Sequence, residues 1–316
     1  MTLDTIKEVI ENSKSIVVFT HENPDGDAVG SSLAAYLILK DMGKDVDVVI
    51  PNFPKTYKFL PHAQEVLIEP KQEKYDLAIA LDCADIKRLD DPKGTFLKSE
   101  TRVNIDHHTS NGMFGDLNFV NPVAPACAQI VTTILGYFKI DISQEVATCL
   151  ITGIITDTGG FRYEGVTSET FEIASAFLEK GVKISKIYKD SLSNISKEKF
   201  EARKLAMNRM EFLENGQIAY TYITKEDMQR LNVIQSDLDG IVENGRDVEG
   251  VEISIFLYET DKGFKASFRS NEYVNVSDIC LLFNGGGHIK AAGCTLPYSL
   301  EESKERVLMQ AKRFLK

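Results

Sequence analysis

Four polar segments, each directly following a short apolar run, constrain the fold of this chain more than any other feature of its sequence. They are rich in His and Asp, which are common ligands of metal ions. The segments are His21–Asp27 after Ser15–Thr20, Asp82 after Tyr75–Leu81, Asp106–His108 after Thr101–Ile105, and Asp157–Gly160 after Ala147–Ile155. We interpret the four positions as strand ends. Because ligands of open α/β sheets bind beyond the carboxyl ends of the strands, we expect these side chains to meet at one edge of a sheet.

The first half of the chain alternates between strand and helix patterns. Runs rich in β-branched residues predict strands at Ser15–Thr20, Asp45–Ile50, Tyr75–Leu81 and Thr101–Ile105. Start and stop signals predict helices at Gly26–Met42, Pro125–Phe138, Ser143–Ile155, Ser168–Glu179 and Lys183–Ser191. This alternation is typical of an α/β fold with a parallel sheet and helices on both faces.

The pattern changes in the last third of the chain. Ser196–Leu213 has helical spacing without Gly or Pro and is expected to form a helical connector. The sequence then predicts strands at Gln217–Ile223, Val251–Tyr258, Gly263–Arg269 and Lys290–Leu296, of which the second and third form a hairpin. It predicts helices at Val276–Phe283 and Leu300–Phe314. Since 316 residues exceed the usual size of one domain, we expect a catalytic domain at 1–190, a helical linker at 191–213 and a smaller α/β domain at 214–316.

The residue types in the four segments indicate which metal they would bind. Carboxylate oxygens with one or two imidazoles suit Mn²⁺ or Mg²⁺ better than a metal that prefers thiolates. Asp25 and Asp27 lie two residues apart and can contact two different ions, while the two oxygens of Asp82 can bridge them. A pair of divalent ions is the usual catalyst of displacement at phosphorus. Each segment taken alone could equally be a solvated turn or a helix cap.

The same segments carry a family resemblance. His21-x-x-x-Asp25-x-Asp27, Asp82, Asp106-His107-His108 and Asp157-Thr158-Gly159 resemble the four motifs of the DHH phosphoesterase superfamily. Gly285-Gly286-Gly287-His288 is similar to the signature of the DHHA1 domain that follows in one branch. The closest group is the small RecJ-like enzymes, which act as oligoribonuclease (nanoRNase) or pAp phosphatase.

The resemblance implies a two-metal centre with one pair of Mn²⁺ ions per chain, or Mg²⁺ in their place. Asp82 would bridge the ions and act in catalysis. The other expected metal ligands are His21 and Asp25 for one ion, and Asp27, His107 and Asp157 for the other. His108 would be catalytic, either facing the phosphate or assisting as an acid. Asp106 would contact a histidine rather than a metal ion and orient its ring, or it would be an exposed turn carboxylate.

A second group of residues is expected to bind the substrate. Three consecutive glycines allow positive φ angles and can present N–H groups to an anion, although a tight loop between a helix and a strand explains them as well. In the DHHA1 domains that the C-terminal segment resembles, such residues hold nucleotide phosphate and sugar. The expected substrate-binding residues are Arg269, Ser270, Gly285, Gly286, Gly287 and His288.

The composition of the chain limits the classes of molecule that it could bind. The net charge of −11 and the pI of about 5.1 argue against broad binding of long nucleic acid, which needs a basic face. Neither a membrane-spanning apolar run nor a signal peptide is evident. The five scattered cysteines are typical of free thiols in a reducing compartment, so we expect a cytoplasmic location. The resemblance suggests a homodimer.

The leading hypothesis is therefore a manganese-dependent phosphoesterase. It would hydrolyse short oligoribonucleotides to mononucleotides, or 3′-phosphoadenosine 5′-phosphate to AMP, or both. The alternative is a phosphodiesterase acting on pApA or cyclic di-AMP. An inorganic pyrophosphatase and a non-catalytic nucleotide sensor rank lower, because pyrophosphatases usually lack the triple-glycine signature and because all the expected metal ligands are present.

Overall fold

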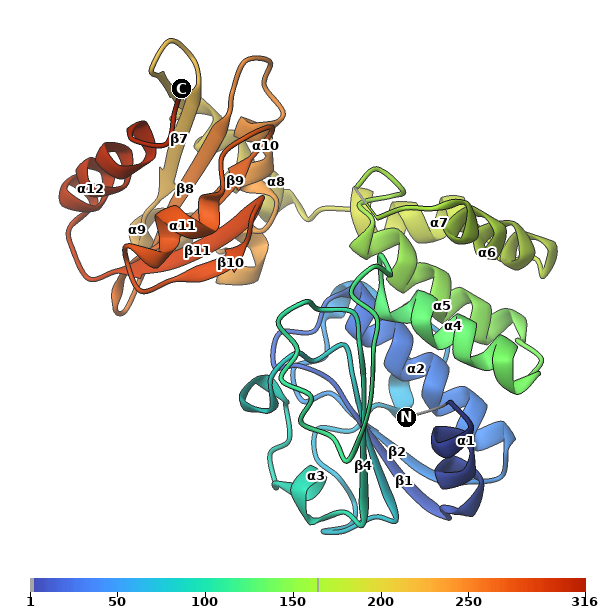
Figure 1. Ribbon diagram of the computed structural model, residues 1–316. Helices are drawn as coiled ribbons and strands as arrows, with labels where there is room; N and C mark the ends of the chain where they lie inside the picture. Colours follow the sequence, from blue (N-terminus) through green and yellow to red (C-terminus); the bar gives the residue numbers. More distant parts are fainter. Residues whose placement is uncertain (1–2, 164) are drawn as a thin grey trace. The chain divides into compact units, whose positions relative to one another are not determined.

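The computed structural model describes residues 3–163 and 165–316, which fold into two compact units, Met1–Asn194 and Ile195–Lys316 (Figure 1). Each unit has a sheet and a hydrophobic core of its own. The α/β class expected from the sequence is confirmed for both units. No helix among the described residues is long and apolar enough to cross a membrane.

Unit 1 is built on a five-stranded parallel sheet with the strand order β2-β1-β3-β4-β5. The strands are β1 (Ser15–Phe19), β2 (Asp45–Val49), β3 (Leu77–Leu81), β4 (Thr101–Asp106) and β5 (Leu117–Val120). The first four are the strands predicted from apolar runs. β5 escaped prediction because it is a half-buried edge strand of four residues, whose sequence lacks a β-branched run.

The helices of unit 1 lie mainly on one face of this sheet (Figure 1). They are α1 (Leu3–Asn12), α2 (Gly26–Asp41), α4 (Cys127–Phe138), α5 (Gln144–Asp157), α6 (Ser168–Glu179) and α7 (Ile184–Tyr188), which continues into a π-helical turn at Lys189–Ser193. The opposite face has a smaller core, in which Phe96 of the short helix α3 (Thr95–Lys98) packs with Tyr75 and Phe19. Helical cover on that face is thus limited to short pieces.

The position of Asp157 differs from the expectation that all four segments follow strands. Asp157 is the last residue of helix α5, which begins after the N-cap Ser143. The apolar run before it imitates a buried strand because α5 packs between other helices and is apolar on most sides. The packing of α5 on α2 is close: a Cβ on Gly30 would lie 2.4 Å from the Cys149 carbonyl oxygen. This crossing brings the end of α5 to the start of α2, and so to the edge of the sheet.

Unit 2 contains a six-stranded sheet with the order β10-β11-β9-β8-β7-β6, antiparallel except for the parallel pair β7–β8. The strands are β6 (Glu211–Leu213), β7 (Ile218–Ile223), β8 (Ile253–Thr260), β9 (Gly263–Ser270), β10 (Gly286–His288) and β11 (Ala291–Leu296). One face packs on α8 (Lys197–Asn208), α9 (Lys225–Leu231) and α10 (Ile241–Arg246), and the other on α11 (Val276–Leu281) and α12 (Leu300–Lys312). The predicted hairpin is confirmed as β8–β9.

Two expected elements of unit 2 differ in the structure. The helix expected as a connector ends at Asn208, and its Ala202 and Ala206 are fully buried in unit 2, so α8 is part of that unit's core. Two of the three consecutive glycines, Gly286 and Gly287, belong to the strand β10. Of the three glycines only Gly287 has a positive φ, 146°. A side chain does not fit at Gly285, because a Cβ there would lie 2.3 Å from the Gly293 carbonyl oxygen of the neighbouring strand.

Candidate metal centre

The loop between β1 and α2 positions three of the expected ligands. His21 follows β1 and is fixed by a bridge to Leu89. Asp25 caps the N-terminus of α2, where its Oδ1 accepts hydrogen bonds from the amides of Asp27 (3.0 Å) and Ala28 (3.1 Å). These bonds use only one oxygen of Asp25, so the second carboxylate oxygen remains for another partner.

Asp27 is fully buried, yet its carboxylate is well satisfied. Its Oδ1 accepts from the amide of Ala128 (2.8 Å) and its Oδ2 from the amide of Cys127 (2.5 Å). Both amides lie at the N-terminus of α4, where the helix dipole favours a negative charge. The fold therefore holds Asp27 as a buried anion without a Lys or Arg partner.

Asp82 directly follows β3 and has a left-handed backbone, with φ of 53°. Such a conformation costs a non-glycine residue free energy, although Asp adopts it more readily than most residues. Its amide donates to the Ile105 carbonyl oxygen (3.0 Å), which fixes the turn. Among the described residues, Oδ1 of Asp82 and Nδ1 of His21 are buried atoms without a hydrogen-bond partner. Buried ligand atoms of this kind can be satisfied by a bound ion.

The segment after β4 supplies two histidines with different partners. Nδ1 of His107 lies 3.2 Å from the Ala124 carbonyl oxygen, so the tautomer with a proton on Nδ1 leaves the Nε2 lone pair for a metal. Nδ1 of His108 lies 2.8 Å from Oδ1 of Asp106. Asp106 is buried, and its second oxygen accepts from Asn111 (2.6 Å). Asp106 thus lies behind His108 rather than in an exposed turn.

These side chains converge into three groups of ligand atoms, each spanning no more than 4.8 Å. The groups are His21, Asp25 and Asp82; Asp27, His107 and Asp157; and Asp82, Asp106, His107 and His108. Nε2 of His107 lies 3.3 Å from Asp157 Oδ2, 3.4 Å from Asp82 Oδ1 and 4.0 Å from Asp27 Oδ2. Nε2 of His21 lies 3.7 Å from the other oxygen of Asp82. The carboxylate of Asp82 therefore has one oxygen toward each side of the cluster.

The carboxyl groups of the cluster need additional positive charge to ionise together. Burial raises the pKa of Asp82 and of Asp157 well above the usual range, and the neighbouring Asp27 raises both further. Burial also raises the pKa of Asp27, to about 6. Burial lowers the pKa of His107, but the surrounding carboxylates outweigh it and raise the value to about 10. Without a cation these acids cannot all ionise, and divalent ions would supply the missing charge.

The expected substrate-binding residues of unit 2 lie in different environments. Nε of Arg269 donates to Glu243 (3.0 Å), and both side chains are about a quarter exposed. His288 is exposed on β10. Ser270 requires a correction: it is buried and donates its hydroxyl to the Val274 carbonyl oxygen (2.7 Å), so it has a structural role instead.

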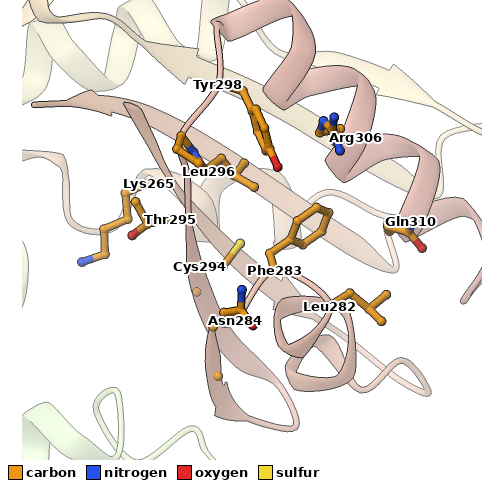
Figure 2. Close-up of a pocket in the computed structure, with 14 residues that line it drawn as sticks. Lys265, Leu282, Phe283, Asn284, Cys294, Thr295, Leu296, Tyr298, Arg306 and Gln310 are labelled. Atoms are coloured by element: carbon orange, nitrogen blue, oxygen red, sulfur yellow. The ribbon is translucent and has the colours of Figure 1, made fainter. Parts of the chain in front are cut away.

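A pocket of about 760 Å³ lies within unit 2, between the end of α11, β11 and α12 (Figure 2). Gly285 and Gly286 line it, together with the rings of Phe283 and Tyr298. Of the expected substrate-binding residues only these two glycines belong to the pocket, and Arg269 and His288 lie outside its lining.

Two residues near the cluster were missed by the sequence analysis. Asn111 bonds both Asp106 and Asn104 (2.8 Å) and so ties the segment after β4 to the strand itself. Its signal in the sequence is only its place three residues after His108. The second missed residue is Arg88, whose charge affects His21. Burial is the main cause that lowers the pKa of His21. The charge of Asp25 opposes this effect, and the charge of Arg88 adds to it.

Comparisons with known proteins agree with this arrangement. The N-terminal domain model of the DHH family matches residues 15–154, and the DHHA1 domain model matches residues 215–316. The bifunctional oligoribonuclease and PAP phosphatase NrnA of Thermus thermophilus is 34% identical, over 93% of this chain and 88% of that protein. The Bacillus subtilis protein of the same name is 26% identical, over 93% and 92%. The crystal structure of an exopolyphosphatase-related protein from Bacteroides fragilis, 28% identical, superposes with a TM-score of 0.91, over 99% of this chain and 96% of that one.

Proposed function

The chain belongs to the DHH family of phosphoester hydrolases, in the group that carries a DHHA1 domain, and from this we propose that it hydrolyses short oligoribonucleotides and 3′-phosphoadenosine 5′-phosphate. The observation that carries the proposal is the convergence of six His and Asp side chains, Asp82 among them. The printed names of the Thermus thermophilus and Bacillus subtilis relatives support the choice of these two substrates. The net charge of −11 fits small phosphorylated substrates better than long nucleic acid.

We propose that two Mn²⁺ ions, or Mg²⁺ in their place, occupy the cluster. His21, Asp25 and Asp82 would hold one ion. Asp82 would be shared with the second site, formed by Asp27, His107 and Asp157. The donor set of carboxylate oxygens and imidazole nitrogens fits these metals, and so do the unsatisfied buried atoms of Asp82 and His21. Divalent ions at such a site neutralise phosphate charge and activate water.

The protein's own side chains would then position and protonate the substrate. Asp106 accepts a hydrogen bond from Nδ1 of His108, which fixes the orientation of the ring. We propose that the protonated His108 donates a proton from Nε2 to the leaving oxygen of the ester. In unit 2 we propose that Arg269, His288 and the backbone of Gly285–Gly287 bind the part of the nucleotide that does not react.

A comparison of four substrates tests the proposed function. Turnover of pAp, pApA, a five-nucleotide RNA and pyrophosphate would be measured with Mn²⁺, with release of AMP or phosphate as the readout. We expect pAp and the RNA to be hydrolysed much faster than pyrophosphate. Asp82→Asn should abolish all turnover while leaving the circular dichroism spectrum unchanged. Full activity of that variant would contradict the proposed centre, and a strong preference for pApA alone would favour a role in cyclic-dinucleotide turnover.

A further inference from the structure

Arg88 is held beside the metal cluster by its backbone. It ends the short 3-10 helix Ile86–Arg88, which follows Asp82 and is capped by Asp85. The Arg88 carbonyl oxygen accepts from the amide of Glu22 (2.8 Å), and the next residue, Leu89, bridges His21. The loop that carries Arg88 is therefore tied directly to the loop that carries His21 and Asp25.

The side chain of Arg88 is exposed, and within residues 3–163 and 165–316 no carboxylate forms an ion pair with it. Six other arginines among these residues have such partners: Arg102, Arg209, Arg230, Arg246, Arg269 and Arg306. Because no such pair holds Arg88, its guanidinium can bind an anion.

The charge balance of the cluster leaves a role for this cation. Asp25, Asp27, Asp82 and Asp157 carry four negative charges when ionised, and two divalent ions cancel them. A phosphate ester that enters such a neutral site adds negative charge that the cluster itself does not balance. A guanidinium can donate two parallel N–H bonds to two phosphate oxygens, which a histidine or a lysine cannot do.

We propose that Arg88 binds the non-bridging oxygens of the phosphate that is cleaved. This inference deepens the proposed function. It rests on that function only in requiring that the reacting group is a phosphate ester bound at the cluster. It gives Arg88 and Arg269 different tasks: Arg88 acts on any substrate, because every substrate has the reacting phosphate. Arg269 acts only on substrates with a nucleotide part that reaches unit 2.

The test compares Arg88→Ala and Arg88→Lys with Lys87→Ala. Lys87 is a matched control, because it is an exposed cation on the same turn. Hydrolysis of pAp and of bis-p-nitrophenyl phosphate would be measured with Mn²⁺, and calorimetry would measure binding of Mn²⁺ and of inorganic phosphate. For Arg88→Ala we expect kcat/KM to fall roughly ten- to a hundredfold on both substrates. Phosphate binding should weaken to a similar extent while Mn²⁺ binding stays unchanged.

The other variants and the small substrate make the outcomes distinct. Arg88→Lys keeps the charge but loses the paired N–H geometry, so it should fall between wild type and Arg88→Ala. Equal behaviour of Arg88→Ala and Lys87→Ala on both substrates would overturn the proposal, as would loss of Mn²⁺ binding in Arg88→Ala. Failure of the wild type to hydrolyse pAp and short RNA would refute the proposed function instead. Bis-p-nitrophenyl phosphate would still test Arg88 in that case.

Discussion

At the scale of single residues, the centre combines buried carboxylates with groups that fix them. Asp27 is held by two helix amides, Asp25 by its role as a cap, and Asp82 by a strained turn. Burying a charge is unfavourable unless it is paired or bound to a metal. Among the described residues the basic side chains that contact these carboxylates are histidines, His21, His107 and His108, so the site depends on cations from solution for its charge balance.

Arg269→Ala separates substrate binding from stability. If Arg269 contacts a phosphate, the variant loses a charge-assisted contact worth about 1.5–3 kcal/mol. KM for a short oligonucleotide should then rise roughly ten- to a hundredfold where KM reports binding. Hydrolysis of bis-p-nitrophenyl phosphate should not change. Lys265→Ala, on the same strand, is the control, since Lys265 lies near the Tyr258 ring. Equal losses on both substrates at an unchanged melting temperature would argue against this role.

Asp227 should make the stability of unit 2 depend on pH. Burial raises the pKa of this carboxyl, but hydrogen bonds from Arg209 and from the Thr224 amide outweigh it and hold the pKa below its usual range. A lowered pKa in the folded state means that the stabilisation is complete above the unfolded value of about 3.9. It is lost as pH falls through the folded value. Asp227→Asn should destabilise the protein by about 2 kcal/mol near neutral pH.

Urea unfolding between neutral and acidic pH, followed by circular dichroism, measures this effect. The difference between wild type and Asp227→Asn should shrink as the pH falls below about 4. A constant difference over the whole range would mean that the ionised carboxylate is not the source of the stabilisation.

At the scale of elements, most helices and strands could be predicted from local sequence patterns. The others depend on packing between distant segments, which local patterns do not reveal. β1 and β3 are central strands with apolar side chains on both faces, so their runs are continuous and easily recognised. Helix α5 was predicted from its N-cap Ser143, but its apolar run was also interpreted as a strand before Asp157, because α5 is buried between helices. The strand β10 could not be foreseen from three glycines, because close packing on β11 determines its conformation. The ion pair of Arg269 with Glu243 joins residues 26 apart in the sequence, which no local pattern reveals.

The three consecutive glycines at positions 285–287 should respond differently to alanine. A Cβ on Gly285 would lie 2.3 Å from the Gly293 carbonyl oxygen, whereas one on Gly286 would meet no atom within 4 Å. Gly285→Ala should therefore destabilise unit 2 by about 1–3 kcal/mol. Gly286→Ala should leave the melting temperature unchanged and raise KM for an oligonucleotide if substrate lies on this strand. If both variants melt as wild type does, close packing does not explain the glycines.

At the scale of the whole molecule, the two units should divide the work. Unit 1 has all six proposed metal ligands and a core of its own. A fragment that ends at Asn194 should bind Mn²⁺ and hydrolyse bis-p-nitrophenyl phosphate. It should lose most turnover of pApA and short RNA, because unit 2 holds the proposed nucleotide-binding residues. Undiminished turnover of dinucleotides by the fragment would mean that unit 2 has a different function.

The number of Mn²⁺ ions bound per chain tests the central claim most directly. Calorimetric titration of metal-free protein should give two ions for the wild type, because the ligand groups around Asp82 form two adjacent sites. Asp82→Asn should bind fewer ions, more weakly, since it removes the ligand that both sites share. A single ion in the wild type, or two ions bound with equal affinity by Asp82→Asn, would contradict a bridged two-metal centre.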